Sequence, residues 1–366
     1  MKRSTARLLI LFGLSLGAMV SARSRHASSR VAEPHVVARI PESSPWSSPE
    51  ACEREVSAGH RAQRPPGSAR LGAWNVRWFP DGNPGRPKHG GPGPEPTDVR
   101  WLACTIAWMD VDVLALEEVK ASPSAATALT ELRSRLDALT GGAHHVEVDR
   151  CPGNGRQSVA LLWDESRVHG EGFRNLDSLN PNGSACDEHL RPGFTGYFRY
   201  PGGADFHFVA VHLKSGEAEK DLALRGASLR GIPQAFRDLQ TTAPDADVLL
   251  AGDFNTMGCL DCRPKVRAGE ELAVFGPTLA ALPVPFREVE SPERCSEYYR
   301  GEGQLLDHFV ASASMQEVPV ATRAHVDGYC AAVACARQDP HAMPRAYREL
   351  SDHCPVLLDV RNQDVD

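Results

Sequence analysis

Short apolar runs alternate with helical stretches along this chain from about residue 70 onward. The apolar runs are rich in β-branched and aromatic residues or are bounded by turn formers, which is typical of β-strands. They fall at residues 71–76, 111–119, 158–163, 206–213, 247–254, 305–312 and 355–360. Between them the pattern predicts helices over residues 97–109 and 122–139. It also predicts a helical segment over 217–239 that Gly226, Gly231 and Pro233 kink or split.

This alternation predicts one α/β domain over residues 68–362, without internal repeats. A domain of about 295 residues is large for a single core, and it is consistent with two β-sheets packed face to face with helices outside. A Gly- and Pro-rich loop, DGNPGRPKHGGPGPEP at 81–96, directly follows a predicted strand end.

The first 22 residues have the pattern of a secretory signal peptide: basic MKRSTAR, apolar LLILFGLSLGAMV, then Val20-Ser21-Ala22. The apolar part is short for a membrane span, although an uncleaved membrane anchor is the alternative. No later apolar run approaches the required length. We therefore expect a soluble, monomeric, secreted or periplasmic protein with no stable membrane insertion after cleavage. Residues 23–67, rich in Ser, Arg and Pro, predict a flexible linker that Cys52 tethers at one point.

The charge is distributed unevenly. Removing three basic leader residues and the net +3 of residues 23–70 from the formal charge of −7 leaves −13 on residues 71–366. Such a domain does not attract nucleic acid by bulk charge. A polyanionic substrate would therefore require divalent cations and a few placed Arg and Lys side chains.

The even number of cysteines behind a signal peptide favours disulfides. Cys259-Leu-Asp-Cys262 could instead be half of a zinc site, although no second pair has zinc-finger spacing. The ten positions are Cys52, Cys104, Cys151, Cys186, Cys259, Cys262, Cys295, Cys330, Cys335 and Cys354.

Most predicted strands end in, or begin with, side chains that can bind metal or phosphate. A buried carboxylate or imidazole is costly unless it is paired or bound to metal, so their number favours a shared cleft. Asp253 and Asn255 carry the strongest signal, because a period of two places both on one face of a buried strand. The set comprises Asn75, Glu117, Glu118, His212, Lys214, Asp253, Asn255, Asp307, Asp352 and His353.

Each of these residues taken alone has a structural alternative. Asn75 is a common turn residue, and His212 could be a satisfied core histidine. Glu117 and Glu118 should alternate faces, leaving one of them solvated. Asp307 and His308 could form a local pair without catalysis.

Other chemistries find less support. The sequence has no G-x-x-x-x-G-K-[ST] phosphate loop, no G-x-S-x-G nucleophile elbow and no H-E-x-x-H zinc helix. A cysteine nucleophile is conceivable at Cys354 beside His353, but neighbouring residues on a strand point to opposite faces.

Together, the stretches AWNVRWF, DVLALEEV, VAVHLKSG, LAGDFNT, LLDHFVAS and SDHCPVL resemble the endonuclease/exonuclease/phosphatase superfamily, in the family's order over residues 71–360. The resemblance implies a four-layered α/β sandwich of two mixed β-sheets and a metal-dependent phosphodiesterase. One departure is visible, because the acidic motif usually reads Gln-Glu and here reads Glu117-Glu118.

The resemblance also implies roles. Glu118 would bind Mg²⁺, with Mn²⁺ or Ca²⁺ as alternatives, beside Asn75 and Asp352. His212 and Asn255 would contact phosphate oxygens, and Asp253 would orient or deprotonate the attacking water. His353, paired with Asp307, would act as general base or electrostatic stabiliser.

Two arginines and one disulfide follow from the same resemblance. Arg191 in LRPGF resembles the family's Arg-x-Pro segment and could grip phosphate, with a surface arginine as the alternative. Arg156 in NGRQSVALLWD is a second phosphate candidate. Cys259 or Cys262 would pair with Cys295, as in pancreatic-type deoxyribonucleases.

The leading hypothesis from the sequence is a secreted nuclease that hydrolyses DNA, with RNA as an alternative substrate. A sphingomyelinase-like or small-molecule phosphodiesterase is the second hypothesis, although loop 81–96 lacks an apolar tip for membrane contact. A non-catalytic binding module is the third, and it is disfavoured because every position of the catalytic scheme holds a competent residue.

Overall fold

The computed structural model describes residues 40–82, 95–151, 156–181, 190–191, 193–299 and 301–365. The predicted signal peptide, residues 23–39 of the predicted linker and most of loop 81–96 lie outside the described residues. Within the described residues, no helix is both long and apolar enough to cross a membrane.

The first of two six-stranded sheets has the order β15-β16-β1-β2-β4-β3. It is mixed, because β1 pairs in parallel with β2 and antiparallel with β16. Its strands are β1 (Ser68–Phe79), β2 (Val113–Lys120), β3 (His144–Val148), β4 (Gln157–Asp164), β15 (His325–Val326) and β16 (Val356–Arg361).

The second sheet has the order β11-β14-β8-β7-β6-β5 and is also mixed, with β7 and β8 parallel and their other neighbours antiparallel. Its strands are β5 (His169–Leu176), β6 (Gly193–Arg199), β7 (Asp205–His212), β8 (Val248–Asp253), β11 (Phe286–Val289) and β14 (Asp307–Ser312). Two hairpins complete the strands: β9 (Gly258–Cys259) with β10 (Val266–Arg267), and β12 (Glu297–Tyr299) with β13 (Glu302–Gln304).

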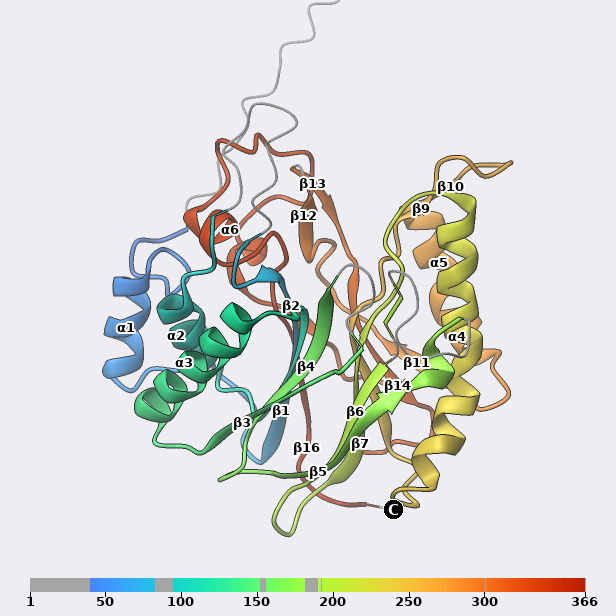
Figure 1. Cartoon of the computed structure of the whole chain (residues 1–366), viewed down its shortest axis with the longest axis horizontal. Helices are drawn as coiled ribbons and strands as arrows, with labels where there is room; N and C mark the ends of the chain where they lie inside the picture. Colours follow the sequence, from blue (N-terminus) through green and yellow to red (C-terminus); the bar gives the residue numbers. More distant parts are fainter. Residues whose placement is uncertain are drawn as a thin grey trace, which may run out of the picture. The chain divides into compact units, whose positions relative to one another are not determined.

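Helices cover the outer faces of both sheets, so the α/β fold is the expected four-layered sandwich (Figure 1). Helices α1 (Pro49–Ser57), α2 (Val99–Met109) and α3 (Pro123–Thr140) lie beside the first sheet, and α4 (Glu219–Gln240) and α5 (Ala268–Ala280) beside the second. The main apolar core lies between the sheets and includes Leu71, Val113, Phe208, Leu249 and Phe309. The shorter elements are η1 (Asp177–Leu179), η2 (Gly328–Ala331) and α6 (Arg345–Glu349).

The predicted helices are present, with caps that explain their bounds. Asp98 caps α2 by accepting from the Trp101 backbone N–H, and Ser122 caps α3 by accepting from that of Ala125. Helix α4 is not split but runs unbroken through Gly226, Gly231 and Pro233. Gly231 is required there because a Cβ at this position would lie 2.1 Å from the Ser178 carbonyl oxygen of η1.

Part of the predicted linker is folded. Residues 49–57 form α1, Ser48 caps it, and a Cys52–Cys104 disulfide ties it to α2. Trp46 is buried and packs edge-on against Trp74 of β1. The folded region therefore begins near residue 40 rather than at 68. The tether expected at Cys52 is confirmed.

All seven predicted strands exist, while the longer strands β3, β5, β6 and β11 and the short strands β9, β10, β12, β13 and β15 were not foreseen from the pattern. Strand β5 (HGEGFRNL) and strand β6 (GFTGYFR) carry glycines and polar residues that interrupt the apolar run. They become strands because β6 pairs with β7 and then offers its other edge to β5.

Candidate active site

Strand register places three candidate residues side by side in the second sheet. His212 and Asp253 are paired at the ends of the parallel strands β7 and β8. Asp307, the first residue of β14, is paired with Asp253 from the other side. In the first sheet, Asn75 of β1 is paired with Glu117 of β2. Five central strands, three from the second sheet and two from the first, thus supply the site.

Asp253 is the centre of this arrangement. Asn75 donates from Nδ2 to Asp253 Oδ2 at 3.2 Å, and His212 Nε2 and His353 Nε2 lie 3.5 and 3.9 Å from the same oxygen. The Asn255 backbone N–H donates to Oδ1 at 2.9 Å. Burial raises the pKa of Asp253 to about 7, against the opposing effect of His353.

His353 is held by a chain of hydrogen bonds. Its Nδ1 lies 2.9 Å from Asp307 Oδ2, and the Ser296 hydroxyl donates to the same oxygen at 2.6 Å. Burial lowers the pKa of His353, but the Asp307 carboxylate overrides this and holds that pKa well above its usual range. Burial, together with Arg191 and His353, keeps the pKa of His212 well below its usual value, so His212 is neutral.

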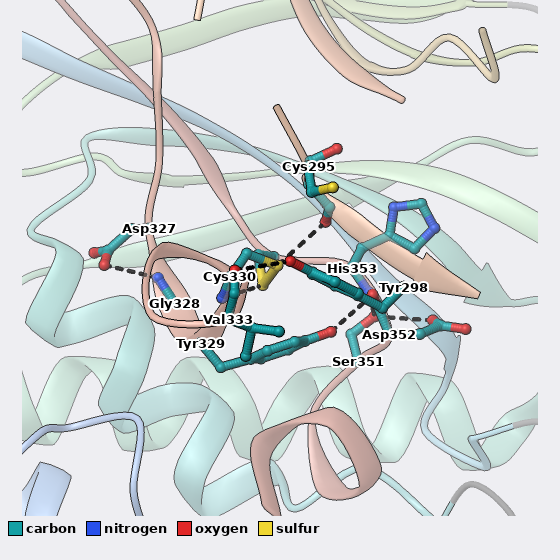
Figure 2. Close-up of a disulfide and its surroundings, with 12 residues drawn as sticks. Cys295, Tyr298, Asp327, Gly328, Tyr329, Cys330, Val333, Ser351, Asp352 and His353 are labelled. Atoms are coloured by element: carbon teal, nitrogen blue, oxygen red, sulfur yellow. Dashed lines mark hydrogen bonds between the residues drawn. A yellow bond between two sulfur atoms is a disulfide. The ribbon is translucent and has the colours of Figure 1, made fainter. Parts of the chain in front are cut away.

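The segment Ser351–Cys354 is fixed on both sides (Figure 2). Ser351 Oγ donates to the Asn75 carbonyl oxygen at 2.6 Å, and Trp74 Nε1 donates to that of His353 at 3.0 Å. The Tyr329 hydroxyl donates to the Asp352 carbonyl oxygen at 2.8 Å, next to a Cys330–Cys354 disulfide. A second disulfide, Cys295–Cys335, ties the residue before Ser296 to the same region. We call residues 328–335 with these two disulfides the cystine clasp.

The cysteine pairing inferred from the resemblance is wrong. Cys259 pairs with Cys262 within its own CxxC, and Cys295 pairs with Cys335. The sulfurs of Cys259 and Cys262 lie three residues apart on one tight loop, so local closure prevails over a longer connection. Their oxidation also removes the zinc half-site, and the disulfide at Cys354 removes the cysteine nucleophile.

Glu117 and Glu118 both turn inward, contrary to the expected alternation. The pairing of β2 shifts register on both sides at this point, and Glu118 adopts a left-handed φ of 62°. Glu118 Oε2 accepts from the Trp78 backbone N–H at 3.0 Å. Glu117 is fully buried, and neither carboxylate oxygen has a hydrogen-bond partner among the described residues. Burial, then Asp307 and Asp253, raise the pKa of Glu117 well above its usual range.

Asn255 is also in the left-handed region, with φ 53°. Its Nδ2 donates to the Leu213 carbonyl oxygen at 3.2 Å, which joins the loop after β8 to the loop after β7. His308 faces away from the site and contacts Glu288 through Nδ1 at 3.0 Å, so it forms no local pair with Asp307.

The two candidate arginines differ. Arg191 is buried and donates from Nη1 to Gln157 Oε1 at 3.2 Å, and burial lowers its pKa while Glu118 and Asp253 oppose the change. It is therefore a buried cation next to the acidic site rather than a surface arginine. Arg156 is exposed and donates to the Ala121 carbonyl oxygen at 2.9 Å, just beyond the end of β2.

The residues present fit a divalent metal ion. Carboxylate oxygens of Asp253 and Asp307 lie within 4.8 Å of each other. Glu117 adds two unpartnered buried oxygens, and the predicted ligands Glu118, Asn75 and Asp352 come from adjacent strand ends and from the segment before β16. Oxygen donors of this kind suit Mg²⁺ or Mn²⁺ better than zinc.

This geometry agrees with a family match. The sequence matches the Endonuclease/Exonuclease/phosphatase family over residues 72–353. The chain belongs to this family. Members of this family depend on divalent metal ions. Membership therefore supports a hydrolase that acts on phosphoester bonds. A search of curated proteins found no match.

Solved structures resemble this chain at low identity, and the first of the following three shows the same fold. A humanized D. rerio TDP2 with 14 mutations is 16% identical, with a TM-score of 0.51, covering 80% of this chain and 98% of that one. An endonuclease/exonuclease/phosphatase from Bacteroides vulgatus is 13% identical (TM-score 0.49; 81% and 99% covered). The human Nocturnin catalytic domain with a bound sulfate anion is 14% identical (TM-score 0.45; 80% and 93% covered).

Two residues at the site were missed by sequence reasoning. Ser296 and Glu297 lie in RCSEYY, a segment without apolar alternation, and both are buried. The nearby cysteine and the short run of tyrosines were the only local signal of a strand. The partners of Ser296 and Glu297 come from β14 and from residues 352–354.

Proposed function

We propose that this protein is a secreted nuclease that hydrolyses DNA phosphodiester bonds by metal-assisted attack of water. The observation that carries the proposal is the buried constellation in which Asp253 lies within 4 Å of Asn75, His212 and His353, with Asp307 behind His353. These side chains come from distant parts of the chain. Packing alone does not require three polar groups to converge on one carboxylate oxygen.

Asp253 and His353 divide the proton chemistry. With a pKa of about 7, Asp253 is a suitable acceptor for the proton of the attacking water near neutral pH. Because the pKa of His353 is raised well above its usual range, its imidazole is protonated and stabilises negative charge on the phosphoryl oxygens. His212 and Asn255 donate hydrogen bonds to the same oxygens, and Arg191 adds a buried positive charge that favours an anionic substrate.

Glu118, Asn75 and Asp352 would hold the divalent ion, with Glu117 behind them. When bound, the ion polarises the phosphoryl oxygen and neutralises its charge. It would also offset the repulsion between DNA and the acidic domain. Export to a secreted or periplasmic location is supported by the disulfides among the described cysteines, since such bonds persist in oxidising compartments.

Cleavage of supercoiled plasmid by the mature protein tests this function. We expect relaxation and linearisation with Mg²⁺, none with EDTA, and a loss of at least about 10²-fold in His353→Ala. A variant at exposed His341, His341→Ala, should cleave like the wild type. Intact DNA and RNA with Mg²⁺, Mn²⁺ and Ca²⁺ would overturn the nuclease assignment. Sphingomyelin and inositol phosphates would then be the substrates to assay.

A further inference from the structure

Glu297 is a buried carboxylate that faces the catalytic residues and lies outside the family motifs. It begins β12, is 2% exposed, and its Oε2 has no hydrogen-bond partner among the described residues. A buried, ionised carboxylate without a partner is strongly destabilising. Such a group is either held neutral by a proton or balanced by a cation.

Backbone pairing fixes the direction of its side chain. Glu297 forms an antiparallel bridge with His353. The flanking hydrogen bonds run from the Tyr298 N–H to the Asp352 carbonyl oxygen (3.0 Å) and from the Cys354 N–H to that of Ser296 (2.7 Å). Glu297 and His353 are therefore a non-hydrogen-bonded pair, the closer kind, whose side chains leave on the same face. The carboxylate of Glu297 thus lies beside the catalytic imidazole.

The charges around Glu297 are mainly negative. Burial, and then Asp352, Asp253 and Asp307, raise its pKa well above the usual range, and His353 is the cation that opposes them. His353 is already engaged with Asp307 at 2.9 Å. Asp352 is also the acid that acts most strongly on Glu118. Among the described residues neither Glu118 nor Glu297 forms an ion pair with a basic side chain, and Asp352 acts on the pKa of both.

A buried carboxylate elsewhere in the protein is neutralised by basic side chains. Asp112, equally buried, is paired with Arg64 and Arg167 at 3.1 and 2.8 Å. It also accepts from the Tyr200 hydroxyl and from the Arg70 backbone N–H. The fold thus surrounds a structural acid with donors. Among the described residues no hydrogen-bond donor contacts Glu297 Oε2, which favours a bound cation as its counter-charge.

We propose that Glu297 is a ligand, together with Asp352, for a hard divalent cation in the catalytic cleft. The ion would be Mg²⁺ or Mn²⁺, because carboxylate oxygens are its preferred ligands. This extends the donor set beyond Glu118, Asn75 and Asp352 to a residue on the β12–β13 hairpin. The inference rests on the metal-dependent function proposed above, but ion binding is measurable without the reaction.

Titration of metal-free protein with Mn²⁺, followed by electron paramagnetic resonance and calorimetry, tests the assignment. Glu297→Gln keeps the shape and removes the charge. We expect it to weaken Mn²⁺ binding at least about tenfold or to remove one bound ion per chain. The matched control is Glu302→Gln on β13 of the same hairpin, whose exposed carboxylate pairs with Arg337 at 3.0 Å. It should bind Mn²⁺ like the wild type.

Stability provides a second readout. Mn²⁺ should raise the melting temperature of Glu297→Gln less than it raises that of the wild type. Glu297→Asp, which keeps the charge but shortens the side chain, should bind with intermediate affinity. Wild-type Mn²⁺ affinity and stoichiometry in both Glu297 variants would overturn the inference.

The two proposals can fail separately. A protein that cleaves no DNA or RNA but needs Glu297 for Mn²⁺ binding would refute the nuclease function and support the cation ligand. A protein that cleaves DNA and binds Mn²⁺ equally well without Glu297 would support the nuclease function and refute the cation ligand.

Discussion

Asp253 is the residue on which the candidate catalytic side chains converge. One of its oxygens, Oδ2, lies within 4 Å of nitrogens from Asn75, His212 and His353. Its burial and its neighbours set its pKa near 7, whereas His353, backed by Asp307, is shifted upward. A carboxylate that can accept a proton near neutral pH, 3.9 Å from a protonated imidazole, suits acid–base catalysis on a phosphodiester.

Asp307→Asn tests the assignment of His353. The substitution keeps the shape of the side chain but removes the negative charge that orients the imidazole and stabilises its protonated form. We expect kcat for plasmid cleavage to fall at least about 10²-fold with an unchanged circular dichroism spectrum. The control is Glu288→Gln, which alters the His308–Glu288 pair on the other face of β14. Equal losses in both variants would show that the effect is structural.

Elements place these residues through irregularities rather than through regular structure. The shift in β2 turns Glu118 into the site, and the left-handed Asn255 directs the chain away from the end of β8. Gly252 makes a close approach possible, because a Cβ there would lie 2.1 Å from the Val211 carbonyl oxygen and 2.8 Å from Glu117 Oε1. Strained or glycine-dependent backbone therefore concentrates where the two sheets deliver their polar ends.

The cystine clasp should matter for catalysis as well as stability. In Cys330→Ser/Cys354→Ser, the residue after His353 is no longer fixed, so we expect about 2–4 kcal/mol lower stability and at least tenfold lower kcat. Cys52→Ser/Cys104→Ser, which removes the α1–α2 disulfide, should cost similar stability and keep kcat. Denaturant unfolding and plasmid cleavage measure both quantities. Full activity in the clasp variant would contradict a positioning role.

At the scale of the whole molecule, the two sheets bring together more carboxylates than the nearby basic side chains can neutralise. Both carboxylate oxygens of Glu117 and Oε2 of Glu297 lack hydrogen-bond partners among the described residues, and the acids Asp253 and Asp307 raise the pKa of both residues. The basic groups at the site are His353 and Arg191. The folded state therefore stores electrostatic strain that a divalent ion would relieve.

Metal-free protein should lose stability as pH rises. A carboxyl such as Asp253, with its pKa raised from 3.8 to about 7, favours folding while protonated, and this contribution disappears as pH rises from about 4 to 7. His353, whose pKa is also raised, contributes fully below about 6.5 and loses its contribution as pH rises through its folded-state pKa. Both effects have the same sign.

We therefore expect the free energy of unfolding in EDTA to fall between about pH 5 and pH 8. Mg²⁺ at 100 times its dissociation constant should restore about 2.7 kcal/mol, mainly at the higher pH, where the ligands are ionised. Denaturant titrations at three pH values, with and without Mg²⁺, measure this. Stability in EDTA that rises over this range would contradict the prediction.

Local pattern by itself determined the strands that carry the site, the capped helices α2 and α3, and the family motifs, because hydrophobic period and capping residues act over a few positions. The polar residues that meet could be predicted for the same reason. Residues at strand ends, such as His212 and Asp253, place their side chains at one edge of the sheet. Tertiary structure alone decided the rest. Edge strands β5 and β6 depend on their neighbours, and the inward turn of both Glu117 and Glu118 depends on a register shift. The disulfide partners, and the approach of Glu297 to His353, depend on contacts between residues distant in sequence, which no local pattern encodes.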